Sequence, residues 1–214
     1  IAFVSNRTED PDKNENTDIY IMDAVPGAAM KKTTSWAGAD HSPQWSPDGK
    51  NITYLQSTSN EAFTMYGHDM IAVISKNGGE PKLSSQSTDR PIYHFTWNKD
   101  GKNIFGLMED DREGNIVSFD IATSTLTKIA KGERVFYELE QNPKNGGLAS
   151  LMGTSVMPFE VVAINNGNVN RLTYIQDEFL QPLQLAVTEG FKSKSKDGTI
   201  VSGIFFKPNS NTTS

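Results

Sequence analysis

Residues able to carry covalent catalysis are few in this sequence, and their spacing is wrong for it. The nucleophile of an α/β-hydrolase lies in a G-x-S-x-G turn, where glycines permit the sharp bend between strand and helix. The nearest approach is Gly153-Thr154-Ser155-Val156-Met157, which lacks the second glycine. His41, His68 and His94 all lie among the repeated segments described below, where a solvated or core-edge imidazole is expected. We therefore expect no catalytic triad and no catalytic residue in this chain.

Acidic residues cluster in two ways, and neither pattern fits a catalytic or metal site well. Asp110-Asp111 and Asp177-Glu178 are neighbours on expected loops, where paired carboxylates usually face water. Oxygen-bearing residues also alternate, as at the start of a calcium loop, at Asp10, Asp12, Asn14, Asn16 and Asp18. In that frame Glu15 stands where an EF-hand needs glycine, and Ile21 where it needs glutamate. Cysteine is absent. We expect a solvated hairpin loop, no metal and no cofactor.

The elements that position these residues follow an internal repeat. The segment WSPDGKNI, from Trp45 to Ile52, recurs as WNKDGKNI from Trp97 to Ile104. A degenerate third copy runs from Gln141 to Leu148, with the same spacing between its first and last residues. Residues 1–4 match residues 52–55, which indicates a first copy without its beginning. Self-similarity at a period of roughly 44 to 52 residues is typical of repeat architectures.

Each copy contains a tight turn between two extended segments. Ser46-Pro47-Asp48-Gly49 has the residues that a type I turn favours, and in the third copy Asn145 takes the place of the glycine. Third and fourth short strands follow each hairpin. The sequence therefore predicts an all-β fold: a partial β-propeller of about four blades of four-stranded antiparallel sheets, at residues 1–188, followed by a short hairpin at 189–214. A two-sheet sandwich is the alternative, but it gives no reason for the recurring turn.

The repeat resembles that of TolB-type propellers, which also occurs in the propellers of prolyl oligopeptidases, dipeptidyl peptidases and acylaminoacyl peptidases. The resemblance rests on Ser46-Pro47-Asp48-Gly49-Lys50 and Asn77-Gly78-Gly79-Glu80-Pro81. The tail from Glu189 to Pro208 is similar to the hairpin that opens the α/β-hydrolase domain of these serine peptidases. The resemblance implies a fragment of a larger propeller whose catalytic domain is missing here. A fifth, degenerate blade is the alternative for the tail, although Lys194 stands where the blades have tryptophan.

Loop lengths indicate which face of the propeller binds a ligand. Turns after the first and third strands of a blade are short, whereas loops after the second and fourth are long and varied, as binding loops on rigid scaffolds usually are. In the resembled dipeptidyl peptidases, acids and an arginine on such loops hold the amino terminus and carbonyl groups of the peptide. The substrate-binding candidates here are Glu61, Glu109, Asp110, Asp111, Arg112, Glu133 and Arg134. The alternative for each is a solvated loop charge.

Charge and hydropathy restrict the partners. The net charge is −6, and its 20 basic residues are scattered among 26 acidic ones, so we expect no nucleic acid partner. No apolar run is long enough for a membrane helix, so we expect no membrane partner, and the sequence does not choose between cytoplasm and periplasm. Open blade edges predict self-association. The resemblance implies a substrate-gating part of a serine exopeptidase that acts on short peptides through the missing hydrolase domain. The alternatives are a protein-binding propeller without a catalytic domain and a sugar-processing propeller enzyme.

Overall fold

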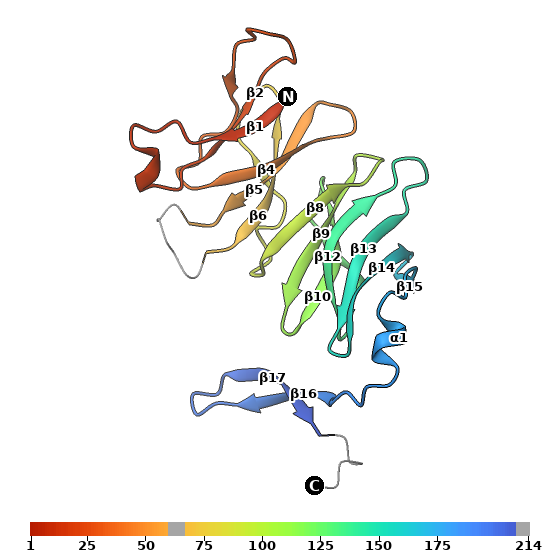
Figure 1. The fold of residues 1–214 in the computed structure, drawn as a ribbon. Coiled ribbons are helices and arrows are strands. Elements are labelled where there is room, and N and C mark those ends of the chain that lie inside the picture. Colours follow the sequence, from red (N-terminus) through yellow and green to blue (C-terminus); the bar gives the residue numbers. More distant parts are fainter. Residues whose placement is uncertain (60–66, 209–214) are drawn as a thin grey trace. The chain divides into compact units, whose positions relative to one another are not determined.

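The computed structural model describes residues 1–59 and 67–208 (Figure 1). Nearly all of the regular structure is β, and the chain groups into two compact units. The first contains Ile1–Gly106 and Val117–Thr127, and the second contains Leu107–Ile116 and Lys128–Ser214. Among the described residues, no helix is long and apolar enough to cross a bilayer.

The strands form successive antiparallel sheets in which each strand pairs with its neighbours in the sequence. The first sheet has the three strands β1 (Ala2–Ser5), β2 (Asp18–Ile21) and β3 (Lys31–Lys32), with the 3-10 turn η1 (Pro11–Lys13) between the first two. The second has four strands, β4 (Asp40–Trp45), β5 (Asn51–Ser57), β6 (Asp69–Ser75) and β7 (Lys82–Leu83). The third is β8 (Ile92–Trp97), β9 (Asn103–Asp110), β10 (Glu113–Asp120) and β11 (Leu126–Ala130). The fourth is β12 (Val135–Gln141), β13 (Leu148–Thr154), β14 (Met157–Asn165) and β15 (Asn168–Arg171). The sheets thus agree with the predicted blades, and the first sheet lacks one strand.

The repeated tryptophans occupy equivalent positions, as the repeat predicts. Trp45 is the last residue of β4 and Trp97 the last of β8, each the first strand of its sheet. The hairpin after each is closed in the same way, since the Ser46 amide donates to the Asn51 carbonyl at 2.9 Å and the Asn98 amide to the Asn103 carbonyl at 2.8 Å. The repeat in sequence is therefore a repeat in structure.

The third copy differs from the prediction in one residue of its turn. Gly146, rather than Asn145, takes the left-handed conformation, with φ of 76°, and its amide donates to the Asn142 carbonyl at 2.8 Å. The turn that this hydrogen bond closes is therefore one residue longer than the turn at residue 46, where the Gly49 amide donates to the Ser46 carbonyl. Glycine adopts positive φ without the steric cost that a Cβ brings, which explains why the turn moves to it.

Apolar residues at alternate strand positions build the core of the first unit. Ile19 of β2, Ile52 and Tyr54 of β5, and Ala72 and Ile74 of β6 form one buried cluster. Burying such side chains contributes about 1.5–3 kcal/mol each in transfer free energy. This packing holds the first two sheets against each other.

Two first strands carry a feature that the sequence did not reveal. The pairing of β4 with β5 shifts register between His41 and Gln44, where Ser42 has φ of 55°. The pairing of β12 with β13 shifts in the same way at Glu138, with φ of 58°. Both residues stand at the same distance before the end of their strands, so the second and fourth sheets share this β-bulge.

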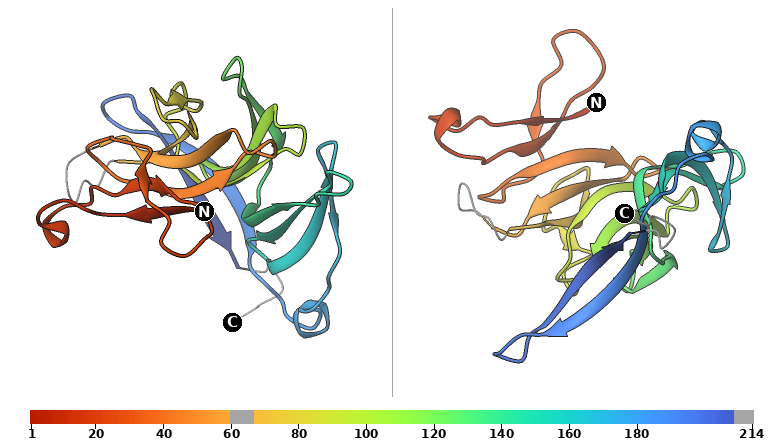
Figure 2. Two further views of the ribbon diagram at one scale, coloured as in Figure 1. Left: turned by 90° about the horizontal axis from the view of Figure 1, so that it is seen from above. Right: turned by 60° about the horizontal axis from the view of Figure 1, so that its bottom comes forward.

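A short helix, α1 (Asp177–Leu180), precedes the final hairpin of β16 (Val187–Lys194) and β17 (Ile200–Lys207), drawn in blue in Figure 2. These strands pair along their whole length, which confirms the predicted short hairpin, although its first strand begins at Val187. They form a sheet of their own. Its last residue pair is Lys194 with Ile200, and the connection between these two residues is one residue shorter than the connection between Trp45 and Ile52. The Gly198 amide donates to the Ser195 carbonyl at 3.0 Å, as the Gly49 amide does to the Ser46 carbonyl, so the turn itself is like a blade turn and the strands close one residue earlier. The domain boundary at 188/189 stays a prediction.

Candidate functional site

A pocket of about 280 Å³ lies in the second unit, between loops of the blades and the final hairpin. The β9–β10 turn contributes Arg112 and Glu113, and the segment before β12 contributes Glu133 and Arg134. The remaining lining residues are Val135, Gly153, Thr154, Ser155, Thr188, Gly190, Ile204 and Phe206. The pocket thus combines charged groups of both signs with apolar walls, as peptide and small-molecule sites often do.

The turn that carries Glu133 and Arg134 is held by backbone contacts. Gly132 has φ of 117°, and its amide donates to the Glu113 carboxylate at 3.1 Å. The Gly114 amide donates to the Arg134 carbonyl at 2.9 Å. These contacts fix the backbone and leave the Glu133 and Arg134 side chains to project from it.

These two side chains have spare capacity for a ligand. Within residues 1–59 and 67–208, the exposed Glu133 carboxylate has no hydrogen-bond or ion-pair partner. The Arg134 guanidinium makes one weak contact, from Nη1 to the Met152 sulfur at 3.8 Å. A carboxylate can accept from an ammonium group, and a guanidinium can donate to a carbonyl or carboxylate. The rim therefore offers a carboxylate acceptor and a guanidinium donor to a ligand.

The other predicted site residues have different surroundings. Lys128 pairs with Asp110 at 2.7 Å, and the Arg112 Nη1 atom donates to the Gly203 carbonyl of the hairpin at 3.2 Å. A hydrogen bond from Ser202 lowers the pKa of Asp111, helped by the charges of Arg112 and Lys192. Glu109 is exposed on β9 and does not line the pocket, and Glu61 lies outside the described residues. Of the predicted set, the structure brings Arg112, Glu133 and Arg134 together.

Sequence reasoning missed the pocket residues that come from the hairpin and from β10. Glu113 directly follows Arg112 in the sequence, so the same loop argument could have included it. Ile204 and Phe206 had no such signal, because the tail from residue 189 was assigned to a separate domain, and Thr188 stood at the end of the predicted propeller. Their approach to the loops depends on tertiary contacts.

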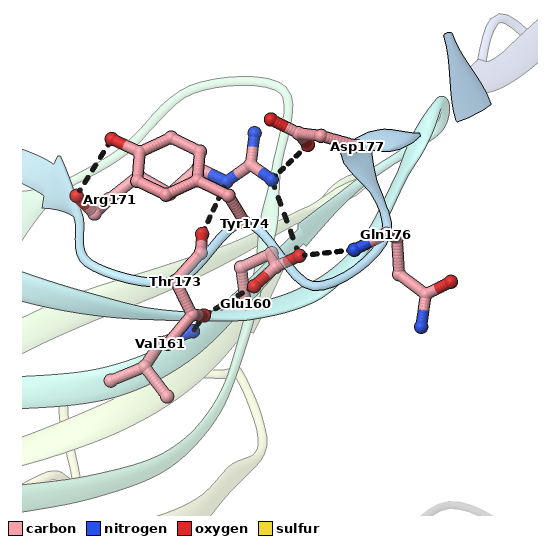
Figure 3. Close-up of polar contacts among 7 residues, drawn as sticks. All are labelled: Glu160, Val161, Arg171, Thr173, Tyr174, Gln176 and Asp177. Carbon is pink, nitrogen blue, oxygen red and sulfur yellow. Dashed lines mark hydrogen bonds and ion pairs between the residues drawn. The ribbon is translucent and has the colours of Figure 1, made fainter. Parts of the chain in front are cut away.

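Glu160 is the centre of a second polar cluster (Figure 3). Its buried carboxylate accepts from the Thr173 hydroxyl, from the Gln176 amide at 3.2 Å and from Arg171 at 3.3 Å. The Thr173 hydrogen bond is the main cause that lowers the pKa of Glu160. Arg171 also pairs with Asp177 and lies 4.5 Å from the Tyr174 ring centroid. Glu160 and Asp177 both pair with Arg171, so the two carboxylates do not form an acid–base pair. The cluster instead anchors the segment after β15.

A serine, a histidine and an aspartate meet in the first unit. His41 Nδ1 lies 3.0 Å from Ser42 Oγ, and its Nε2 lies 3.1 Å from Asp69 Oδ2. The hydrogen bond with Asp69 raises the pKa of His41. In the serine protease triad Nε2 faces the serine and Nδ1 the aspartate, and the serine of a hydrolase follows a strand-to-helix turn. Ser42 instead lies at the β-bulge of β4, where these contacts fix the strand.

The loop at 10–18 is filled by its own hydrogen bonds. Asn14 Oδ1 accepts from Asn6 Nδ2 at 2.9 Å and from the Asn16 amide at 3.0 Å. Asp18 pairs with Lys32 at 2.6 Å. In the part of the chain that the structure describes, no group of three or more His, Cys, Asp or Glu residues is arranged to hold a metal. The closed hairpin loop fits the arrangement favoured from the sequence.

Comparison with known proteins finds similarity to peptidases that contain a propeller and to TolB propellers. No protein-family model matches the chain. It is 22% identical over 187 residues to dipeptidyl-peptidase 5 of Porphyromonas gingivalis, covering 86% of this chain and 26% of that protein. The chain thus spans about a quarter of that relative.

Solved structures establish the fold. Acylaminoacyl peptidase of Pyrococcus horikoshii matches with a TM-score of 0.75 at 18% identity, over 98% of this chain and 32% of that one. The β-propeller domain of the Trilobed protease from Pyrococcus furiosus matches with a TM-score of 0.57 at 20% identity, over 75% and 44%. The sheets are therefore an open portion of a β-propeller, and the chain resembles the propeller portion of a peptidase.

Proposed function

We propose that this chain is the substrate-gating propeller portion of a serine exopeptidase that cleaves short peptides in its full-length form. Residues 1–188 supply the propeller, and residues 189–214 open an α/β-hydrolase domain. The chain by itself supplies binding and selection, and the triad belongs to that further domain. The similarity to dipeptidyl-peptidase 5 supports a peptide as substrate.

The observation that carries this proposal is the charged rim of the pocket. Glu133 and Arg134 stand side by side on a fixed turn, above walls that include Val135, Ile204 and Phe206. A peptide with a free amino terminus would place its ammonium group against Glu133 and a carbonyl against Arg134. Its first apolar side chain would then contact the walls.

The hairpin favours a peptidase over a binding module without a catalytic domain. Val187, Phe191, Val201 and Phe205 lie on one face of the hairpin, and each is between 44% and 56% exposed. Contiguous apolar surface of this kind usually marks an interface. A hydrolase sheet that begins with this hairpin would cover the face, whereas a propeller that ends here would leave it in water.

Peptide titration of the 214-residue chain tests the proposal. We expect the dipeptide Gly-Phe to shift the amide NMR signals of residues 132–135, and N-acetyl-Gly-Phe to bind about tenfold more weakly, because it lacks the ammonium group. Glu133→Gln should weaken Gly-Phe binding by a similar factor. Glu140→Gln, which removes an exposed carboxylate outside the pocket, is the matched control. Equal affinities for both peptides, or equal effects of both variants, would contradict the proposal.

A further inference from the structure

The register of the final hairpin divides its side chains between two faces. Thr188 pairs with Phe206, Gly190 with Ile204 and Lys192 with Ser202. Paired residues share a face, and alternate residues along a strand return to the same face. These residues therefore form the inner face of the hairpin, and four of them line the pocket. The apolar residues Val187, Phe191, Val201 and Phe205 form its outer face.

The inner face is held by the β9–β10 turn and by the β13–β14 turn. Arg112 Nη1 donates to the Gly203 carbonyl at 3.2 Å. Lys192 Nζ lies 3.7 Å from Asp111 Oδ2, and the Ser155 and Thr188 hydroxyl oxygens are 2.6 Å apart. These contacts join residues far apart in the sequence, so they determine how the hairpin lies on the loops of its own unit.

The backbone at Gly190 makes room for the Arg112 side chain. A Cβ at this position would lie 1.8 Å from Arg112 Nη1 and 2.8 Å from Cζ. Real Cβ atoms do not approach this closely, so any side chain at Gly190 would displace the guanidinium. The backbone of Gly190 has no positive φ that would itself demand glycine. The Arg112 guanidinium therefore occupies the space that a side chain at Gly190 would take, and it would have to move away to admit one.

The β9–β10 turn is shaped for this contact. Asp111 adopts φ of 61°, which is unfavourable for a residue with a Cβ, and places two opposite charges next to each other on the turn. Both charges are used, since Arg112 donates to the hairpin backbone and Asp111 faces Lys192 and Ser202. A guanidinium suits this role because its fork of donors is rigid and always charged.

We infer that the β9–β10 turn is a docking platform for the inner face of the hairpin, and that Arg112 is a positioning residue whose contact with Gly190 and Gly203 sets the orientation of the hairpin. An isolated two-stranded hairpin is marginal in water, so docking also determines how often its strands separate. Glu133 and Arg134 are not among the residues of these contacts, although the hairpin supplies Ile204 and Phe206 to the walls of their pocket. The inference therefore does not rest on the proposed peptide substrate.

Hydrogen exchange of the 214-residue chain tests the inference. In Arg112→Ala we expect the amides of 187–194 and 200–207 to exchange about fivefold faster, because a charge-assisted hydrogen bond is lost at a partly exposed site. Gly190→Ala should give a similar increase by displacing the guanidinium, although alanine is otherwise favoured over glycine in a strand. Within 148–165, the amides of 148–151 and 160–165, which lie away from the β13–β14 turn, should be unchanged and serve as the internal reference.

Two further variants make the result decisive. Lys207→Ala removes the ion pair with Glu189 on the outer face, and we expect it to change hairpin exchange by less than about twofold. Adding Gly190→Ala to Arg112→Ala should bring no further increase, because the clash is with the side chain already removed. The inference is overturned if Arg112→Ala and Gly190→Ala leave exchange within twofold of the unchanged chain. Equal acceleration of the reference amides and the hairpin, or additive effects of the two substitutions, would overturn it as well.

Discussion

Asp40 is a buried carboxyl at the start of β4 whose pKa is raised to about 6. Burial is the main cause, and hydrogen bonds from Thr34 and Gln56 oppose it only in part. The Asp18 charge raises the pKa further, whereas His41 lowers it. One of the two Asp40 oxygens, Oδ2, has no hydrogen-bond partner among the described residues. The sheet therefore tolerates the protonated form of Asp40 better than the ionised form.

This raised pKa predicts that stability falls as the pH rises from about 4 to about 6. In that range the unfolded chain has released the proton while the folded chain still holds it, so unfolding releases a proton and is favoured by higher pH. We expect Asp40 to cost of the order of 2 kcal/mol of unfolding free energy at pH 7 relative to pH 4. Urea titrations measure the unfolding free energy at both pH values. In Asp40→Asn, the loss of unfolding free energy between pH 4 and pH 7 should be smaller by about 2 kcal/mol than in the unchanged chain.

A matched control is Asp23→Asn, which changes an exposed carboxyl in the connection between β2 and β3. It should leave the pH dependence of the unfolding free energy as in the unchanged chain. An Asp40→Asn variant with the same pH dependence as the unchanged chain would show that Asp40 does not titrate in this range.

The sequence predicted which charged residues line the pocket better than it predicted the groups that these residues contact. Glu133 and Arg134 could be found because charged residues between strands project into water, although the structure places them on a short connection between β11 and β12 and not on the long loop expected from the sequence. Arg112 was found by the same argument, but its acceptor, Gly203, lies in a segment that only tertiary contacts bring near. Asp40 gave no signal, because burial of a carboxyl depends on packing around it.

At the scale of the elements, the two repeated tryptophans have the same place in their strands but different surroundings. Trp97 is 7% exposed and Trp45 is 37% exposed. We expect Trp97→Ala to lower the unfolding free energy by about 3 kcal/mol or more, and Trp45→Ala by about 1 kcal/mol, since the cost follows the buried volume that is lost. Urea unfolding followed by far-UV circular dichroism measures both. Equal losses would mean that the two blades bury this position equally.

Strands and turns were predictable where local chemistry decides them. Ser46-Pro47-Asp48-Gly49 closes as predicted because Pro47 fixes φ at the second position and Gly49 adopts a positive φ of 66° without steric cost. The third copy moved its turn to Gly146 because two possible left-handed residues, Asn145 and Gly146, stand next to each other. The bulges at Ser42 and Glu138 escaped prediction, since neither residue favours positive φ.

For the whole molecule, the repeat carried the prediction of the fold. The recurrence of four groups of short strands favoured propeller blades over a two-sheet sandwich. The solved structures agree with the propeller architecture. The pocket was not predictable at this scale, because it needs the hairpin to return to the loops of its own unit. A strand pattern gives the order of sheets and says nothing of which exposed face a tail contacts.

The last prediction concerns the reactivity of the chain as a whole. Ser42, His41 and Asp69 form a hydrogen-bonded chain, but Ser42 lies at a β-bulge and meets the wrong ring nitrogen for a protease triad. No serine in the sequence lies in the glycine-flanked elbow of a hydrolase. We therefore expect a fluorophosphonate probe to leave the 214-residue chain unlabelled under conditions that label trypsin completely. Intact-protein mass spectrometry measures this directly. Stoichiometric labelling that disappears in Ser42→Ala would show that the serine of β4 is a nucleophile, and the catalytic role assigned to a further domain would then have to be given up.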